Sequence, residues 1–199
     1  HPQATLVQRL DIANQLGKAI QALHHRDILH QKIYPGNVLI DTHGQVLLTD
    51  FSACRTRDGG SHGDARDLLR QVGLTEHSAP EYALDDSVGR RSDQYSFAST
   101  AYWLLTGELP YELTPNRLRS HTDLEQLVYR SARTRNPEVT PALDEALRRA
   151  LDPQRSLRFR RMSEFLRELR QPLAAVRQEE RPGPRVFRDS GQFWQGIAA

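Results

Sequence analysis

The stretch His30-Gln31-Lys32-Ile33-Tyr34-Pro35-Gly36-Asn37, followed thirteen positions later by Asp50-Phe51-Ser52, decides the fold of this chain. Between the two polar stretches, the apolar runs Val38-Leu39-Ile40 and Val46-Leu47-Leu48 flank a turn that contains a glycine. Short apolar runs on both sides of such a turn are typical of a β-hairpin. The sequence therefore predicts one short hairpin between two polar segments.

Helical patterns lie on both sides of this hairpin. From Leu6 to Arg26, apolar residues recur at steps of three and four, as in an amphipathic helix. Gly17 is the weak point of this helix, because glycine has a low helix propensity. A second helix is predicted over 93–106, with Ser92 as its cap and Gly107 as its stop signal. It is apolar on most sides, so we expect it in the middle of the core.

The rest of the chain predicts more helices and two polar segments. The stretch from Arg55 to Gln71 is rich in Gly, Asp and Arg and should form a surface loop. Three more amphipathic helices are predicted, over 123–133, 141–151 and 163–173, the last with Ser163 as its cap. These five helices and the hairpin predict the class α+β, mainly α, and about six to seven helices are expected in all.

Composition limits the kinds of protein that this chain can be. With 199 residues, 38% apolar and 26% charged, it is long enough for one ordinary core with a tail. A formal charge of +2 argues against a dedicated nucleic-acid binder. Cys54 is the only cysteine, which excludes an internal disulfide and fits a reducing compartment. No apolar run reaches the roughly 18 residues needed to span a bilayer.

From about residue 5 to residue 173, the order of these elements and motifs resembles the C-terminal lobe of a protein kinase. His30 corresponds to the His of the His-Arg-Asp motif, and Asp50-Phe51-Ser52 corresponds to Asp-Phe-Gly. Asn37 corresponds to the metal-binding Asn of the catalytic loop. The resemblance implies that Asn37 and Asp50 are the nucleotide-binding and metal-binding residues, and that His30 and Phe51 pack.

Three more residues have a structural role in this resemblance. Ala79-Pro80-Glu81 matches the motif that ends the activation segment, and Asp93 matches the Asp that braces the catalytic loop. Either Arg155 or Arg158 should pair with Glu81. We favour Arg158, because Arg158-Phe159 and the residues that follow fit bacterial kinases better.

The same resemblance implies that the catalytic chemistry is partly lost. Lys32 stands where a kinase has its catalytic Asp, and a lysine is cationic with no lone pair to accept a proton. Tyr34 stands at the position of the catalytic-loop Lys, so a charge that would steady the transferring phosphate is missing. Gln31 replaces the usual Arg. No intact catalytic residue is expected, although Asn37 and Asp50 keep oxygen ligands suited to Mg²⁺.

The upper half of a kinase ATP site is not found in this sequence. The chain is too short for a two-lobed kinase, it has no Gly-x-Gly-x-x-Gly, and its one lysine besides Lys32 is Lys18, on the first helix. An N-terminal lobe is therefore expected to be absent. ATP and Mg²⁺ are expected in a full-length parent at most, and no cofactor for this chain itself. In the other interpretation, Asn37 and Asp50 only satisfy backbone groups.

Two functional hypotheses from different classes follow. The first is a pseudokinase that acts as a regulatory or interaction module with a protein partner. The alternative is a Ser/Thr protein kinase, acting on a protein substrate with ATP, whose N-terminal lobe lies outside this chain. A decayed gene without a selected function is a third possibility.

The C-terminal residues suggest a location. Several segments, among them Leu105–Tyr111 and Phe193-Trp194-Gln195-Gly196, are similar to a bacterial bifunctional family that joins a phosphatase domain to a Ser/Thr kinase domain and ends in membrane helices. Residues 1–173 would then form the lobe, and 174–199 an Arg/Pro-rich juxtamembrane linker with a membrane anchor just after residue 199. The expected location is the cytoplasm, on the membrane's cytoplasmic face in this interpretation. The alternative is a solvated linker.

Overall fold

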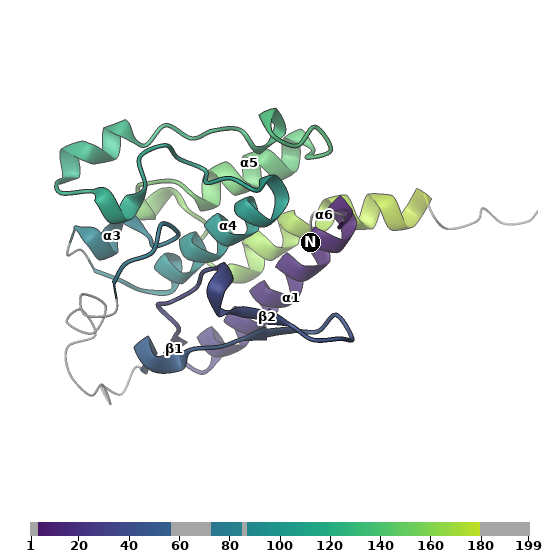
Figure 1. Cartoon of the computed structure of the whole chain (residues 1–199), viewed down its shortest axis with the longest axis horizontal. Coiled ribbons are helices and arrows are strands. Elements are labelled where there is room, and N and C mark those ends of the chain that lie inside the picture. Colours follow the sequence, from purple (N-terminus) through teal and green to yellow (C-terminus); the bar gives the residue numbers. More distant parts are fainter. Residues whose placement is uncertain (1–3, 57–72, 85–86, 180–199) are drawn as a thin grey trace, which may run out of the picture.

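The computed structural model describes residues 4–56, 73–84 and 87–179 (Figure 1). These residues form a mainly helical domain with two antiparallel sheets of two strands each, in agreement with the predicted class. The α-helices are α1 (Leu6–His25), α3 (Pro80–Ala83), α4 (Arg90–Thr106), α5 (Pro141–Ala150) and α6 (Met162–Glu179). The strands are β1 (Ile28–Leu29), β2 (Val38–Ile40), β3 (Val46–Leu48) and β4 (Arg55–Thr56). Short 3-10 helices are η1 (Pro35–Asn37), η2 (Phe51–Ala53), η3 (Pro115–Arg117), η4 (His121–Gln126), η5 (Ala132–Thr134) and η6 (Arg155–Leu157).

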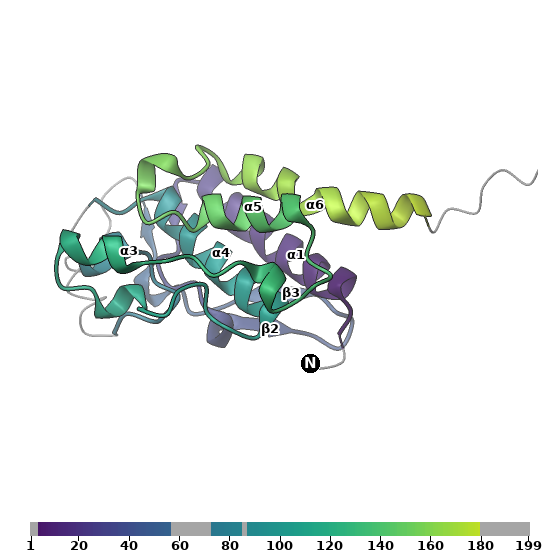
Figure 2. The same ribbon diagram turned by 90° about the horizontal axis from the view of Figure 1, so that it is seen from above.

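Helix α4 lies in the middle of the molecule, as its pattern predicted. Figures 1 and 2 show α1 and α6 side by side next to it, and α4 packs against α1, α5 and α6. The side chains of Tyr95, Phe97 and Tyr102 on α4 are completely buried. The helix begins three residues earlier than predicted, because Gly89 is its N-cap and donates its N–H to the Ser92 hydroxyl. Its last residue is Thr106, and Gly107 is its C-cap, with a φ of 78° that suits a glycine.

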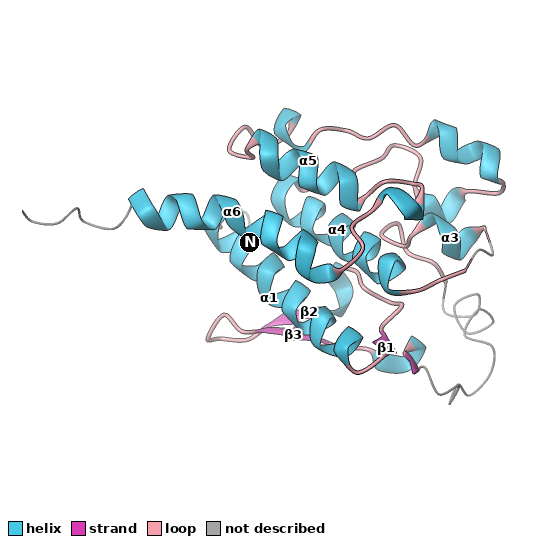
Figure 3. Ribbon diagram, turned by 180° about the vertical axis from the view of Figure 1, so that it is seen from behind, coloured by secondary structure: helices cyan, strands magenta, loops and turns pink. Residues whose placement is uncertain are grey.

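The predicted hairpin is confirmed, and it packs against α1. Strands β2 and β3 pair antiparallel, with Leu39 opposite Leu47 (Figure 3). Val38, Val46 and Leu48 lie against the core. The cross-strand pair Leu39 and Leu47 is 54% and 52% exposed on the outer face. The hairpin is thus fixed to the domain by one face only.

The helix predicted over 123–133 is wrong. The chain forms η4 and the start of η5 there, with no regular element between them, because its backbone groups find partners elsewhere. Arg130 donates its N–H to the carbonyl of Pro110 at 2.9 Å, and Ala132 donates to the Asp144 carboxylate at 2.7 Å. These tertiary hydrogen bonds replace the i to i−4 bonds of a helix.

The other predicted helices are present with shifted ends. Helix α5 has the Thr140 hydroxyl as its cap, accepting from the N–H of Leu143, and it ends one residue early. Helix α6 begins at Met162, so Ser163 lies in its first turn, and it continues through the boundary expected at residue 173. Its contact with α1 includes a hydrogen bond from the Arg170 guanidinium to the Asn14 side chain.

Several expectations fall outside the described residues. Most of the loop predicted over 55–71 does so, although its first two residues form β4. The tail from residue 180 onward lies outside as well, so the membrane anchor after residue 199 stays a prediction. In the part of the chain that the structure covers, no helix combines the length and the apolar character that crossing a bilayer requires.

Gly17 has a packing role that propensity alone did not reveal. A Cβ at this position would lie 2.3 Å from Leu166 Cδ2 on α6 and 2.8 Å from Phe97 Cζ on α4. Both neighbours belong to the buried core. Glycine is therefore the residue that lets α1 approach the other two helices closely.

We predict that Gly17→Ala destabilises the domain, although alanine is the better helix former. Overpacking a buried contact costs about 1–3 kcal/mol, which exceeds the gain of at most about 1 kcal/mol in helix propensity. Urea unfolding would measure the change. The matched control is Lys18→Ala at the neighbouring exposed position, which should change stability by no more than about 0.5 kcal/mol. A more stable Gly17→Ala protein would contradict the packing role.

Candidate functional site

The Asp93 carboxylate, in the first turn of α4, fixes the loop over residues 30–37, which contains most of the candidate site residues. Its Oδ2 accepts the N–H of His30 at 2.9 Å, and its Oδ1 accepts the N–H of Gln31 at 2.8 Å. The His24 imidazole at the end of α1 contacts Oδ2 at 2.9 Å. Asp93 is 1% exposed, so these partners compensate the loss of its hydration. One carboxylate thus joins α1, α4 and the loop.

Two residues of the site hold a left-handed backbone. Gln31 has a φ of 65° and Asp50 a φ of 58°. Such a conformation costs about 1–3 kcal/mol for a residue other than glycine, and it persists only where the surroundings enforce it. The buried Gln31 amide finds no hydrogen-bond partner among the described residues, so its side chain does not repay this cost. The bonds to Asp93 are what hold Gln31 in place.

Lys32 forms an ion pair with Asp50. Its Nζ lies 2.5 Å from Asp50 Oδ2, and the side chains of Lys32 and Asp50 are 14% and 30% exposed. The backbone of Lys32 is also held, because its N–H donates to His30 Nδ1 at 3.3 Å and its carbonyl accepts from the Asn37 side-chain amide at 2.9 Å. Lys32 thus contacts Asn37 through its backbone carbonyl and Asp50 through its ammonium group.

The second oxygen of the Asp50 carboxylate is engaged as well. Oδ1 accepts the Ser52 hydroxyl at 2.5 Å and the Ser52 N–H at 3.3 Å. The hydrogen bond from Lys32, followed by that from Ser52, lowers the pKa of Asp50 to about 2. At neutral pH the carboxylate is therefore ionised, and both of its oxygens have partners.

This arrangement does not fit the divalent metal ion that the resemblance implies. Mg²⁺ binds carboxylate oxygens at about 2.0–2.1 Å and requires nearly octahedral geometry. Here an ammonium group already contacts Asp50 Oδ2, so a divalent ion at this oxygen would have to displace it. Nowhere in the described ranges do three or more His, Cys, Asp or Glu side chains gather in a way that could hold a metal ion.

Tyr34 lies over its own loop. A Cβ on Gly36 would meet Tyr34 Cε2 at 2.5 Å, so the ring occupies the space directly above that glycine. The ring is half-buried in this position. At the position where a kinase presents a lysine to phosphate, this chain has an aromatic ring packed on the loop backbone.

His30 and Phe51 differ in how they pack. His30 is completely buried, and its Nε2 lies 3.1 Å from the Thr49 carbonyl oxygen. Burial lowers the pKa of its imidazole, which favours the neutral form. Phe51 makes an edge-to-face contact with His30 at 5.1 Å but is 51% exposed. The expected packing role of Phe51 is thus limited to one side of its ring.

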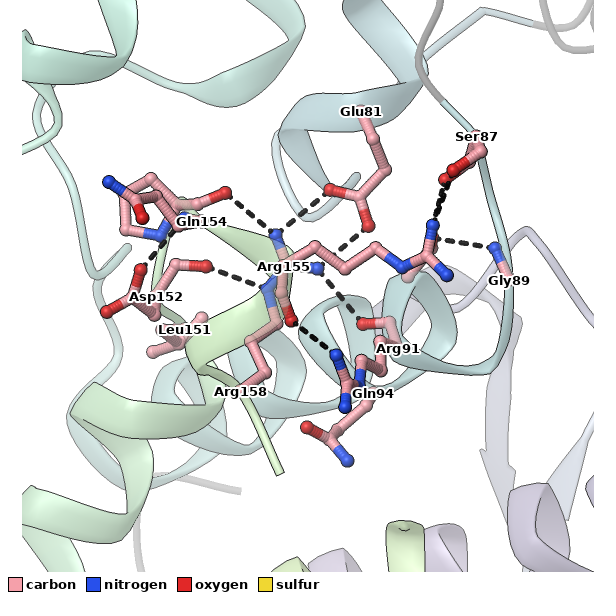
Figure 4. A network of polar contacts seen from close by, with 12 residues as sticks. Glu81, Ser87, Gly89, Arg91, Gln94, Leu151, Asp152, Gln154, Arg155 and Arg158 are labelled. Carbon is pink, nitrogen blue, oxygen red and sulfur yellow. Dashed lines mark hydrogen bonds and ion pairs between the residues drawn. The ribbon is translucent and has the colours of Figure 1, made fainter. Parts of the chain in front are cut away.

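Glu81 pairs with Arg158, and not with Arg155 (Figure 4). The two N–H···O bonds between guanidinium and carboxylate are 2.8 and 2.9 Å long, and Arg158 is 1% exposed. The other donors of Arg158 reach the backbone carbonyls of residues 91, 152 and 153. Arg155 instead donates to Ser87. The pair joins α3, α4 and the segment before α6.

The sequence did not reveal the contact between Lys32 and Asp50. No neighbour in the sequence suggested a partner for Lys32, because Asp50 lies 18 residues away, beyond the hairpin. In the resemblance, Ser52 corresponds only to the Gly of Asp-Phe-Gly, whereas its hydroxyl binds Asp50. The sequence did contain one hint of this contact. Position 32 carries a cationic side chain, and position 50 carries the carboxylate that the resemblance assigns to metal binding.

Most of the chain is similar in sequence to known proteins. Residues 5–189 match the protein kinase domain family. Serine/threonine-protein kinase PknF of Mycobacterium tuberculosis is 30% identical over 166 residues, which cover 80% of this chain and 33% of that protein. For PknA of the same organism, the identity is 32% over 107 residues, or 54% of this chain and 24% of PknA. A probable serine/threonine-protein kinase of Streptomyces coelicolor is 27% identical over 170 residues. The chain spans a third or less of the length of these relatives.

We predict that Arg158→Met destabilises the domain by about 3–5 kcal/mol, because it leaves the Glu81 carboxylate buried and unpaired. Thermal and urea unfolding would measure the loss. Arg155→Met removes an arginine that is only partly buried and should cost no more than about 1 kcal/mol.

The double variant Glu81→Gln/Arg158→Met separates charge from packing. It should recover part of the stability lost in Arg158→Met, because no buried charge remains without a partner. Equal losses for Arg155→Met and Arg158→Met would contradict the assignment of the pair.

Proposed function

Because the chain belongs to the protein kinase family, we propose that it is a kinase-fold domain with impaired phosphoryl-transfer chemistry that serves as a regulatory or interaction module. The observation that carries this proposal is the Lys32–Asp50 ion pair at the position of the catalytic loop. Proteins of this family transfer a phosphoryl group from ATP with the help of Mg²⁺.

Catalysis of phosphoryl transfer depends on positioning the hydroxyl, binding the phosphates and holding the metal ion. The residue at position 32 would have to orient the attacking hydroxyl through a carboxylate oxygen. The Lys32 ammonium offers donors only, and its partner is Asp50. The ring of Tyr34 packs on Gly36 and carries no positive charge for phosphate. The residues that would position the hydroxyl and bind the phosphates are therefore missing.

The scaffold of the lobe supports a role in binding. Asp93 keeps its three contacts to the loop and α1, and Arg158 keeps its bidentate pair with Glu81. These buried polar contacts fix the loop and α3 in place, and so define the surface around them, whether or not the domain catalyses a reaction. We propose that this surface serves a protein partner, and that the chain itself uses no cofactor. The narrower likeness to the kinase–phosphatase family and the absence of an N-terminal lobe stay predictions.

The alternative function is a Ser/Thr kinase that is active within a longer protein. Two observations favour it: Asn37 and Asp50 both contact Lys32, and the relatives are named serine/threonine-protein kinases. In this alternative, Lys32 would have to leave Asp50 when ATP and a metal ion bind. The two functions therefore differ in whether the ion pair breaks.

An assay of phosphoryl transfer tests the proposal. The longest protein that contains this chain should transfer no labelled phosphate from ATP to itself or to generic protein substrates. The reason is that Lys32 has no carboxylate oxygen to orient the attacking hydroxyl. Its Asp50→Ala variant should give the same background level. ATP-dependent labelling that disappears in Asp50→Ala would overturn the proposal and support the alternative.

A further inference from the structure

We propose that the Lys32 ammonium takes the place of a divalent metal ion on Asp50, so that the lobe excludes Mg²⁺ and Mn²⁺ and keeps its loop geometry without them. The inference builds on the proposed function, because it explains how the site is held when no catalysis takes place. It goes further in assigning a definite role to Lys32, as a resident cation and not only a lost catalytic residue.

Distance and charge support the substitution. Lys32 Nζ lies 2.5 Å from Asp50 Oδ2. A Mg²⁺ ion would need to come within about 2.0–2.1 Å of the same oxygen, in nearly octahedral geometry. Both cations cannot contact this oxygen without strong repulsion, which would be largest where water is scarce. With its side chain only 14% exposed, Lys32 is partly shielded from solvent.

The other oxygen of the Asp50 carboxylate is engaged as well. Asp50 Oδ1 accepts two hydrogen bonds from Ser52. The Asn37 amide donates to the carbonyl of Lys32, so Asn37 supports the residue that carries the cation. A divalent ion would therefore have to break the ion pair and also rearrange the hydrogen bonds of Ser52.

Lys32 connects the same two segments that a bound metal would connect. Its backbone belongs to the loop held by Asp93, through the neighbouring N–H groups of His30 and Gln31. Its side chain reaches Asp50, on the far side of the hairpin. The contact between the loop and the Asp50 segment is thus supplied by the chain itself. It follows that the conformation of this surface does not depend on metal ions.

Mn²⁺ titration of the full chain tests the inference without any phosphoryl-transfer assay. Electron paramagnetic resonance reports the free Mn²⁺ that remains, and thermal unfolding with and without MnCl₂ is the second readout. The wild-type chain should show no binding that depends on Asp50. Lys32→Met is one atom shorter, keeps an unbranched side chain and removes the charge, so it should bind Mn²⁺ at least about tenfold more tightly than wild type.

Three controls complete the design. Adding Asp50→Asn to Lys32→Met should abolish the gained Mn²⁺ binding. Lys18→Met removes the chain's other lysine, at an exposed position of α1, and should behave as wild type. Lys32→Asp is a second variant in case Lys32→Met folds poorly, and Mn²⁺ should raise its unfolding temperature by relieving the repulsion between two carboxylates.

Two results would overturn the inference. One is Mn²⁺ binding by the wild-type chain that Asp50→Asn removes. The other is the absence of Mn²⁺ binding in both Lys32→Met and Lys32→Asp, because Lys32 would then not be what excludes the metal. Neither result depends on activity, so a kinase-active parent protein would disprove the proposed function separately.

Discussion

The hydrogen bonds accepted by the Asp93 carboxylate are the constraint on which the candidate site depends. They fix two consecutive backbone N–H groups of the loop and the imidazole of His24, and they do so in a place that water does not reach. A buried carboxylate without such donors would be very unfavourable, so the loop and Asp93 require each other. Because the loop is held through its backbone, its side chains can differ without changing its path.

This separation of backbone support from side-chain chemistry explains how the site departs from a conventional kinase. Asp93 holds the loop through backbone N–H groups, whatever side chain stands at position 32. Lys32 is therefore placed where it reaches Asp50, and the ion pair follows from their opposite charges. The Glu81–Arg158 pair makes a similar contribution farther away, by joining α3 to the rest of the lobe. The buried polar contacts of the scaffold are thus separate from the contact between Lys32 and Asp50.

The sequence predicted the fold well where local pattern and tertiary packing agree. The periodicity of α1, the stop at Gly107 and the hairpin are all present. The prediction failed over 123–133, where hydrogen bonds to Pro110 and Asp144 override the helical pattern. For Gly17, propensity identified a weak position, but the reason for the glycine is the approach of two other helices.

For the site, the sequence identified the residues but not their interactions. The choice of Arg158 over Arg155 came from the resemblance to bacterial kinases, since spacing alone left both open. The Lys32–Asp50 contact depends on how the hairpin returns the chain, which no local pattern contains. Phe51 was expected to pack, yet half of its surface is exposed. Such contacts between distant segments need three-dimensional coordinates.

The ion pair between Lys32 and Asp50 is the central claim, and a double-mutant cycle tests it most directly. The free energy of unfolding would be measured for wild type, Lys32→Met, Asp50→Asn and the double variant under identical conditions. A direct, partly buried pair predicts a coupling energy of about 1 kcal/mol that decreases at high salt. Strictly additive effects of the two substitutions would contradict the account, because they would show that the two side chains do not interact.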